Sequence, residues 1–201
     1  MALTDLHDSL RDCQRCRLAS GRTQVVFGTG NPEASIMFVG EAPGFHEDQQ
    51  GIPFVGAAGN LLTELLESAG LARDHVYIAN VIKCRPPENR NPMPDEVETC
   101  KPFLLEQIQI INPQLVCSLG NFATQTLLGK KVGISKVHGQ PLPLPGFLLF
   151  PLFHPAAALH QGTLLPTLRE DFQKLKQLLD EMATTPRDTP IATQPAQMDL
   201  F

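Results

Sequence analysis

The stretches that decide the fold read SIMFV at residues 35–39, VYIANVI at 76–82, QLVCSL at 114–119 and FLLFPLF at 147–153. Each has the length of a β-strand, and most of them are apolar on both faces, which is typical of strands buried on both sides of a parallel sheet. Segments with helical patterns alternate with these runs. This alternation predicts an α/β/α sandwich, in which a parallel sheet lies between two layers of helices.

The helical segments carry recognisable start, stop and periodicity signals. Residues 57–69 place leucines on one face before Gly70, and residues 94–111 begin with Pro-Asp-Glu and end before Asn112-Pro113. Residues 121–128 predict a short helix, and residues 167–182 carry apolar side chains on one face. The first ten residues, MALTDLHDSL, indicate an amphipathic helix and not a signal peptide, because no basic start precedes an apolar stretch.

Length and composition indicate one domain followed by a tail. The chain has 201 residues, of which 42% are apolar, and this is enough for one sizeable core. Residues from about 183 onward are rich in Thr, Pro and Gln and lack periodicity, so we expect a domain over 1–182 and a disordered tail over 183–201. No apolar run has the length of a membrane span, and a cytoplasmic location is expected.

The net charge of −5 argues against a broad surface that coats nucleic acid. Local basic clusters still allow a small DNA footprint. One cluster contains Lys83, Arg85 and Arg90; a second, at residues 130, 131 and 136, has the plain alternative reading of a solvated face.

Unusual residues lie within or directly after each of the four apolar runs. Residues 40–44 read GEAPG, Asn80 lies within the second run, Gly120-Asn121 follows the third and His154-Pro155 follows the fourth. Taken alone, each has a plain structural reading: a tight turn, a satisfied amide, a structural histidine. Because ligands bind outside the carboxyl ends of parallel strands, the four together predict one cleft.

The cysteines suggest a metal centre. Cys13 and Cys16 form a C-x-x-C pair, and Cys84 and Cys100 lie further along the chain. This spacing suits four thiolate ligands of one site, and both zinc and an iron–sulfur cluster satisfy it. The fifth cysteine, Cys117, lies within the third apolar run and is expected to be a buried core thiol.

Six motifs in this order resemble those of the bacterial and archaeal family 4 uracil-DNA glycosylases. They are C-x-x-C at 13–16, GEAPGFHED at 40–48, GIPFVG at 51–56, NVIKCRPPENRNP at 80–92, Cys100 and HPAA at 154–157, and the resemblance covers residues 10–180. It implies a central four-stranded parallel sheet between helices. It also implies a [4Fe–4S] cluster on Cys13, Cys16, Cys84 and Cys100, and so favours iron–sulfur over zinc.

The resemblance further implies how a uracil base would be held. A uracil in DNA must be flipped into a pocket before an enzyme can act on it. Phe54 would stack on the flipped ring, and the backbone of Gly40, Glu41 and Ala42 would help to hold it. The side-chain amide of Asn80 donates one hydrogen bond and accepts another, which matches O4 and N3–H of uracil and mismatches cytosine.

The implied chemistry is hydrolysis of the N-glycosidic bond, which leaves an abasic site and begins base-excision repair. His154 would stabilise the negative charge that develops at O2 of uracil. Glu41 is the first candidate to position the attacking water, and Glu47 is the second. Arg85 and Arg90 are expected to contact phosphates, and a monomer is expected because the site is complete within one chain.

The last five residues, QMDLF, resemble the short motif with which bacterial repair and replication proteins bind the sliding clamp. Gln197 would orient the peptide, and Leu200 and Phe201 would fill an apolar pocket. The plain alternative is an incidental apolar end.

Three other functions stay open at this point. One is a non-catalytic iron–sulfur protein that binds DNA damage, one is an electron-transfer protein, and one is an RNA-modifying enzyme. The electron-transfer reading leaves Phe54, Asn80 and the HPAA motif without a role.

Overall fold

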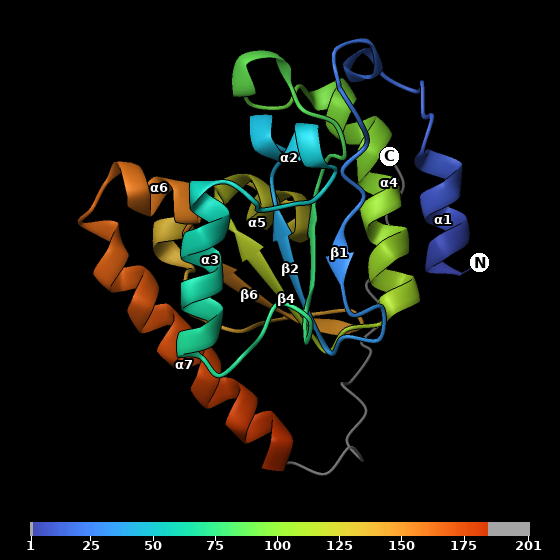
Figure 1. Cartoon of the computed structure of the whole chain (residues 1–201). Coiled ribbons are helices and arrows are strands. Elements are labelled where there is room, and N and C mark those ends of the chain that lie inside the picture. The colour runs from blue at the N-terminus through green and yellow to red at the C-terminus, as the bar shows by residue number, and fades with distance from the viewer. Residues whose placement is uncertain (1, 185–201) are drawn as a thin grey trace.

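The computed structural model describes residues 2–184 of the chain; Met1 and residues 185–201 lie outside this description. A single six-stranded sheet organises the described part (Figure 1). The strands are β1 (Thr29–Gly30), β2 (Ile36–Gly40), β3 (Tyr77–Asn80), β4 (Leu115–Leu119), β5 (Leu142–Leu144) and β6 (Phe147–Leu152). The helices are α1 (Leu3–Leu10), α2 (Phe45–Gln50), α3 (Ala57–Ser68), α4 (Pro94–Ile111), α5 (Gly120–Leu128), α6 (Pro155–His160) and α7 (Leu164–Thr184).

The four expected strands form the centre of the sheet and are parallel. The strand order is β1-β3-β2-β4-β6-β5, with parallel pairing across β3-β2-β4-β6. The expectation of four parallel strands is confirmed for this centre. The two edge strands, β1 and β5, pair antiparallel with their neighbours and were not expected, because one is two residues long and the other contains a proline.

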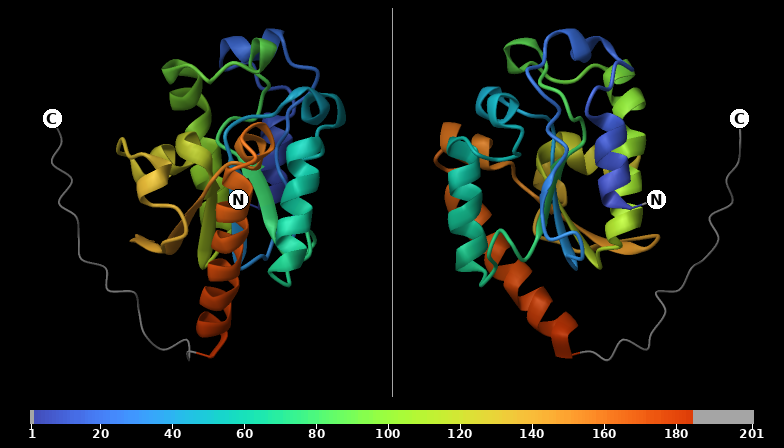
Figure 2. Two further views of the ribbon diagram at one scale, coloured as in Figure 1. Left: turned by 90° about the vertical axis from the view of Figure 1, so that its left-hand side faces the viewer. Right: turned by 45° about the vertical axis from the view of Figure 1, so that its right-hand side comes forward.

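Helices cover both faces of the sheet, which confirms the α/β/α sandwich (Figures 1 and 2). Helices α3, α6 and α7 lie on one face, and α1 and α4 lie on the other. Alternate side chains of each strand serve the two layers: Phe38 of β2 packs toward the α3 and α7 side, and Met37 packs toward the α4 side. This is why both faces of the strands read as apolar in the sequence.

The long helices match their sequence signals. Helix α4 spans the expected residues, because Pro94 opens it, Glu96 accepts a hydrogen bond from the Met93 N–H, and Asn112 ends it in the left-handed conformation. Helix α7 begins earlier than expected and includes residues 183 and 184. The short helices α2 and α6 were not expected. Among residues 2–184, no helix has both the length and the apolar character needed to cross a bilayer.

Candidate functional site

The carboxyl ends of the parallel strands meet at one edge of the sheet, as expected. Gly40 at the end of β2 is the register partner of Asn80 at the end of β3. A Cβ atom on Gly40 would lie 2.4 Å from Asn80 Oδ1 and 2.6 Å from Cζ of Phe54. His154, after β6, brings its ring to 5.7 Å from that of Phe54, centroid to centroid. We call the group of Gly40, Phe54, Asn80 and His154 the strand-end pocket, and the name stands for these four neighbouring residues.

Asn80 presents an unpaired acceptor in this pocket. Its side chain is 2% exposed. Among residues 2–184, its Oδ1 is the buried side-chain polar atom that has no hydrogen-bond partner. An unmade hydrogen bond at a buried group costs about 1–3 kcal/mol. A ligand that brings an N–H donor would remove this cost, so the geometry favours a ligand with a donor beside Oδ1.

Phe54 is held in an unfavourable backbone conformation. Its φ is +54°, a value that bulky residues rarely adopt. The Arg73 guanidinium donates to the carbonyl of Pro53 at 3.0 Å, and Gly59 approaches so closely that a Cβ there would lie 1.9 Å from the Phe54 carbonyl oxygen. The fold thus fixes the ring beside Gly40 against its local preference, which is common at functional sites.

Glu47 and Glu41 lie six residues apart and differ in their contacts. Glu47 Oε1 accepts hydrogen bonds from the N–H groups of Val55 and Gly56 at 3.0 and 2.9 Å, and its Oε2 accepts from that of Gly44 at 3.1 Å. Glu47 therefore joins the turn after β2 to the loop that carries Phe54. Glu41 has no side-chain partner in the described part of the chain, and burial raises the pKa of its carboxyl.

His154 caps helix α6 and is neutral at pH 7. Its Nδ1 accepts a hydrogen bond from the Ala156 N–H at 3.1 Å, so the proton of the neutral ring is on Nε2. Burial lowers the pKa of His154 to about 4, and the nearby Glu47 carboxylate opposes that shift. The side chain therefore offers one N–H donor and carries no charge at neutral pH.

The four predicted metal-ligand cysteines lie around a common cavity. Cys13, Cys16, Cys84 and Cys100 all line it. Two donors point at the sulfurs: the Lys83 N–H lies 3.3 Å from Cys100 Sγ, and the Arg22 guanidinium lies 3.5 Å from Cys84 Sγ. Donors of this kind stabilise thiolates and their metal centres.

The four thiols suit a four-thiolate centre in residue type, and they line one cavity. Within residues 2–184, no group of three or more Cys, His, Asp or Glu side chains already stands in coordinating positions. The four cysteines therefore lie near one another, but their sulfur atoms are not arranged in a coordination geometry. Cys117 lies fully buried in β4, and burial raises the pKa of its thiol, so the expectation of a core thiol is confirmed.

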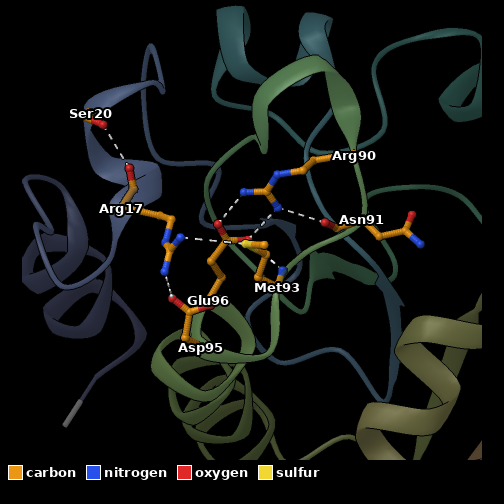
Figure 3. A network of polar contacts seen from close by, with 7 residues as sticks. All are labelled: Arg17, Ser20, Arg90, Asn91, Met93, Asp95 and Glu96. Atoms are coloured by element: carbon orange, nitrogen blue, oxygen red, sulfur yellow. Dashed lines mark hydrogen bonds and ion pairs between the residues drawn. The ribbon is translucent and has the colours of Figure 1, made fainter.

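The basic cluster expected at residues 83–90 is divided by the fold. Lys83 is 1% exposed, so its assignment to a surface cluster was wrong. The Arg85 guanidinium lies 5.1 Å from the centre of the exposed Phe45 ring and donates to Asn89 Oδ1. Arg90 forms two hydrogen bonds to the buried carboxylate of Glu96 (Figure 3).

Arg85 and Arg90 differ in how many of their guanidinium N–H groups are already used: Arg85 donates to Asn89, whereas Arg90 donates twice to Glu96. Arg90 orders the loop before α4, and it holds the pKa of Glu96 below its usual range. Arg17, close by in Figure 3, pairs with Asp95 at 2.7 Å and so ties the segment after Cys16 to the start of α4. The expected phosphate contacts of Arg85 and Arg90 stay predictions, and Arg85 is the better placed of the two.

Several residues that build the site were not identified from the sequence. Arg73, Gly59, Lys83 and Gln107 act through contacts between segments far apart in the chain. Lys83 alone gave a local signal, because it directly follows an apolar run that enters the core. The others look like ordinary helix and loop residues.

The family model that matches this chain and three of its relatives all describe uracil-DNA glycosylases. The model of the uracil DNA glycosylase superfamily matches residues 27–181. The chain is 44% identical to a type-4 uracil-DNA glycosylase of Sulfurisphaera tokodaii, over 92% of this chain and 87% of that protein. It is 45% identical to one of Saccharolobus solfataricus (89% and 87%) and 47% identical to one of Thermotoga maritima (86% and 92%).

Proposed function

The chain belongs to the type-4 uracil-DNA glycosylases of the uracil-DNA glycosylase superfamily, and from this premise we propose that the strand-end pocket excises uracil from DNA. The reaction is hydrolysis of the N-glycosidic bond, which leaves an abasic site for base-excision repair. The flipped nucleotide enters at the carboxyl edge of the sheet, where Gly40, Phe54, Asn80 and His154 meet.

The unpaired Oδ1 of Asn80 is the observation that carries the proposal. Uracil supplies the missing donor with N3–H, and its O4 accepts from the amide nitrogen of Asn80. Cytosine has an acceptor at N3 and a donor at C4, so it would leave both amide groups unpaired. A buried site that must hydrogen-bond its ligand discriminates strongly against a mismatched one.

Phe54 and His154 complete the contacts with the base. The ring of Phe54 stacks on uracil, and the lack of a Cβ atom at Gly40 lets Phe54 and Asn80 lie directly against the backbone of β2. The Nε2–H of His154 donates to O2, where negative charge develops as the bond breaks. Because His154 is neutral and anchored by the Ala156 N–H, its donor is oriented before the substrate arrives.

Glu41 is proposed to position the attacking water and to stabilise the positive charge on the sugar. Its carboxylate has no competing partner among residues 2–184, and it directly follows Gly40. Glu47, the second candidate, accepts three backbone hydrogen bonds, which supports a role in holding the pocket loops together.

A [4Fe–4S] cluster is proposed to be bound by Cys13, Cys16, Cys84 and Cys100; the cavity that they share and the donors beside two of their sulfurs support this proposal. When bound, it would fix the N-terminal segment and the loop after β3 to helix α4. Cys100→Ala should lose iron and visible absorbance, whereas Cys117→Ala, the matched buried control, should keep both. Equal iron content in the two variants would contradict this ligand set.

Arg85 is proposed to contact a DNA phosphate, and Arg90 to do so with the part of its guanidinium that Glu96 leaves free. The exposed Phe45 beside Arg85 would lie at the same DNA-facing rim. We propose a monomer that acts on nucleoid DNA in the cytoplasm.

Residues 197–201 lie outside the described residues, and binding of the sliding clamp is proposed from their sequence alone. Leu200→Ala with Phe201→Ala should abolish binding to a bacterial clamp, while uracil release from short oligonucleotides stays intact. Ala196→Gly is the matched control. Unchanged clamp affinity of the double variant would sink this assignment.

The test of the function is uracil release from a single-stranded oligonucleotide that carries one uracil, read as alkali-sensitive cleavage. The wild type should cleave this strand and leave matched strands with thymine or cytosine intact. Binding to the uracil strand without base release would instead support the alternative of a non-catalytic damage-binding protein.

A further inference from the structure

Lys83 is a buried cation for which the proposed chemistry has no use. Its side chain is 1% exposed, and within residues 2–184 it pairs with no carboxylate. Its Nζ donates to the main-chain carbonyl of Asn80 at 2.8 Å and to the side-chain oxygen of Gln107. Burying an ammonium group is costly, so a lysine with these two neutral partners calls for a role that offsets this cost.

Helix α4 holds Lys83 at two points. Cys100 Sγ accepts from its main-chain N–H at 3.3 Å, and Gln107 Oε1 accepts from its Nζ. Cys100 and Gln107 are seven residues apart, about two helical turns, so they lie on the same face of α4. Gln107 is itself fixed, because its amide nitrogen donates to the carbonyl of Phe27 at 2.9 Å.

The other end of this network is the backbone of Asn80. Its carbonyl, which accepts from Lys83, belongs to the peptide that directly follows the base-reading side chain. The next two N–H groups, of Val81 and Ile82, donate to the carbonyls of Gly40 and Glu41. The direction in which the Asn80 amide points is therefore set by β2 on one side and by Lys83 on the other.

We propose that Lys83 is a positioning residue, which orients Asn80 for uracil and links it to helix α4 and the four-cysteine site. The proposal rests on the function proposed above. Two hydrogen bonds to the base require the amide to be placed within a fraction of an ångström, and small displacements cost large factors in rate. A rigid contact to the Asn80 backbone supplies that placement.

Lys83→Met tests the proposal, since methionine keeps the length and loses both Nζ hydrogen bonds. The main-chain N–H that points at Cys100 remains, so iron per chain should match the wild type. We expect kcat/KM on the uracil strand to fall about ten- to hundredfold. Inhibition by free uracil should weaken by a similar factor, while the affinity for an abasic-site oligonucleotide, which lacks the base, stays unchanged.

Two further variants keep the test decisive. Lys101→Met, one residue after Cys100 and without a hydrogen bond or ion pair in the described chain, should leave every readout unchanged. Gln107→Leu removes one anchor of Lys83 and should act in the same direction as Lys83→Met with a smaller effect. The double variant should lose less than the product of the two single losses, because both disturb one contact. If Lys83→Met folds poorly, Gln107→Leu alone carries the test, because it removes a partner of Lys83 Nζ and leaves Lys83 in place.

Normal inhibition of Lys83→Met by uracil would overturn the positioning role, as would parallel loss of iron and of abasic-site binding. Failure of the wild type to release uracil is a separate result that would overturn the proposed function. In that case, the titration of both proteins with free uracil still decides whether Lys83 orients Asn80.

Discussion

Two buried polar sites in this molecule differ in whether their hydrogen bonds are complete. Asp171 of α7 is fully buried, and both of its oxygens are paired: Oδ2 lies 2.6 Å from His138 Nδ1 and Oδ1 lies 3.1 Å from Lys174 Nζ. Asn80 is equally buried, yet its Oδ1 has no partner. The hydrogen bonds of Asp171 are complete within the chain, whereas that of Asn80 Oδ1 is proposed to be completed by the bound uracil.

The backbone conformation also differs between the two sites. Asp171 lies within a regular helix, whereas the strand-end pocket includes Phe54 in the left-handed region. A buried group that is fully paired stabilises the fold, and one that is left unpaired lowers stability in exchange for binding. Burial alone therefore does not distinguish a structural polar residue from a functional one. The distinction comes from whether its hydrogen-bonding atoms have partners.

Asn80→Ala should give the largest effect on activity and the smallest cost in stability. We expect kcat/KM for uracil release to fall about a thousandfold, because the base loses both readout hydrogen bonds. The thermal midpoint should stay level or rise slightly, since the unpaired oxygen is removed. Calorimetry measures the thermal midpoint, and the release assay measures kcat/KM. A large drop in the midpoint would contradict the claim that Asn80 does not stabilise the fold.

Glu41→Gln should lower kcat about a hundredfold and change the pH profile. Burial raises the Glu41 pKa above its ordinary value of 4.5, and the role proposed for Glu41 needs the carboxylate, so wild-type activity should fall as pH drops through this raised value. Burial lowers the pKa of His154 to about 4, so the Gln variant is needed to separate the two groups: it removes the part of the acid limb that belongs to Glu41. If the Gln variant kept the same acid limb in its pH–activity profile, that limb would belong to a group other than Glu41.

Asp171→Asn should give the opposite pattern to Asn80→Ala. The variant loses the ion pair with Lys174 and weakens the hydrogen bond with His138. We therefore expect the free energy of unfolding to fall by about 2 kcal/mol. Uracil release per folded molecule should be unchanged. Urea unfolding with an activity assay below the transition checks this, and a catalytic defect without destabilisation would contradict the division into two kinds of site.

The smallest effect is expected at Arg85 and Arg90, the two arginines that are proposed to contact phosphates. Arg85→Ala should weaken binding to the uracil strand about fivefold and reduce the slope of log affinity against log salt by about one, as for the loss of one phosphate contact. Arg90→Ala should mainly loosen the loop anchored on Glu96. A larger salt effect from Arg90 than from Arg85 would reverse their assigned roles.

The sequence predicted the elements of this fold better than the contacts of its site. Strands β2, β3, β4 and β6 were readable because burial on both faces leaves uninterrupted apolar runs. The placement of Asn80 and His154 at one edge followed from parallel topology. Helix α2 was missed, since its six residues carry too few apolar positions to show a period.

Apart from Lys83, the residues whose contacts build the pocket have no local sequence signal. The stacking role of Phe54 was predicted, but its left-handed backbone was not, because this conformation depends on Arg73, Glu47 and Gly59, which come from other segments. Glu47 and Glu41 are alike as residue types, and only the fold shows that one is saturated by backbone N–H groups and the other is free. Lys83 was assigned to the surface because charge alone says nothing about burial.

The most direct test of the central claim is inhibition by methylated bases. If Asn80 Oδ1 accepts from N3–H of uracil, then 1-methyluracil, which is altered where the sugar attaches, should inhibit the wild type about as well as uracil. In contrast, 3-methyluracil, which lacks this donor, should inhibit weakly, and Asn80→Ala should no longer distinguish the two. Equal inhibition of the wild type by both compounds would contradict the assignment of the unpaired oxygen to base reading.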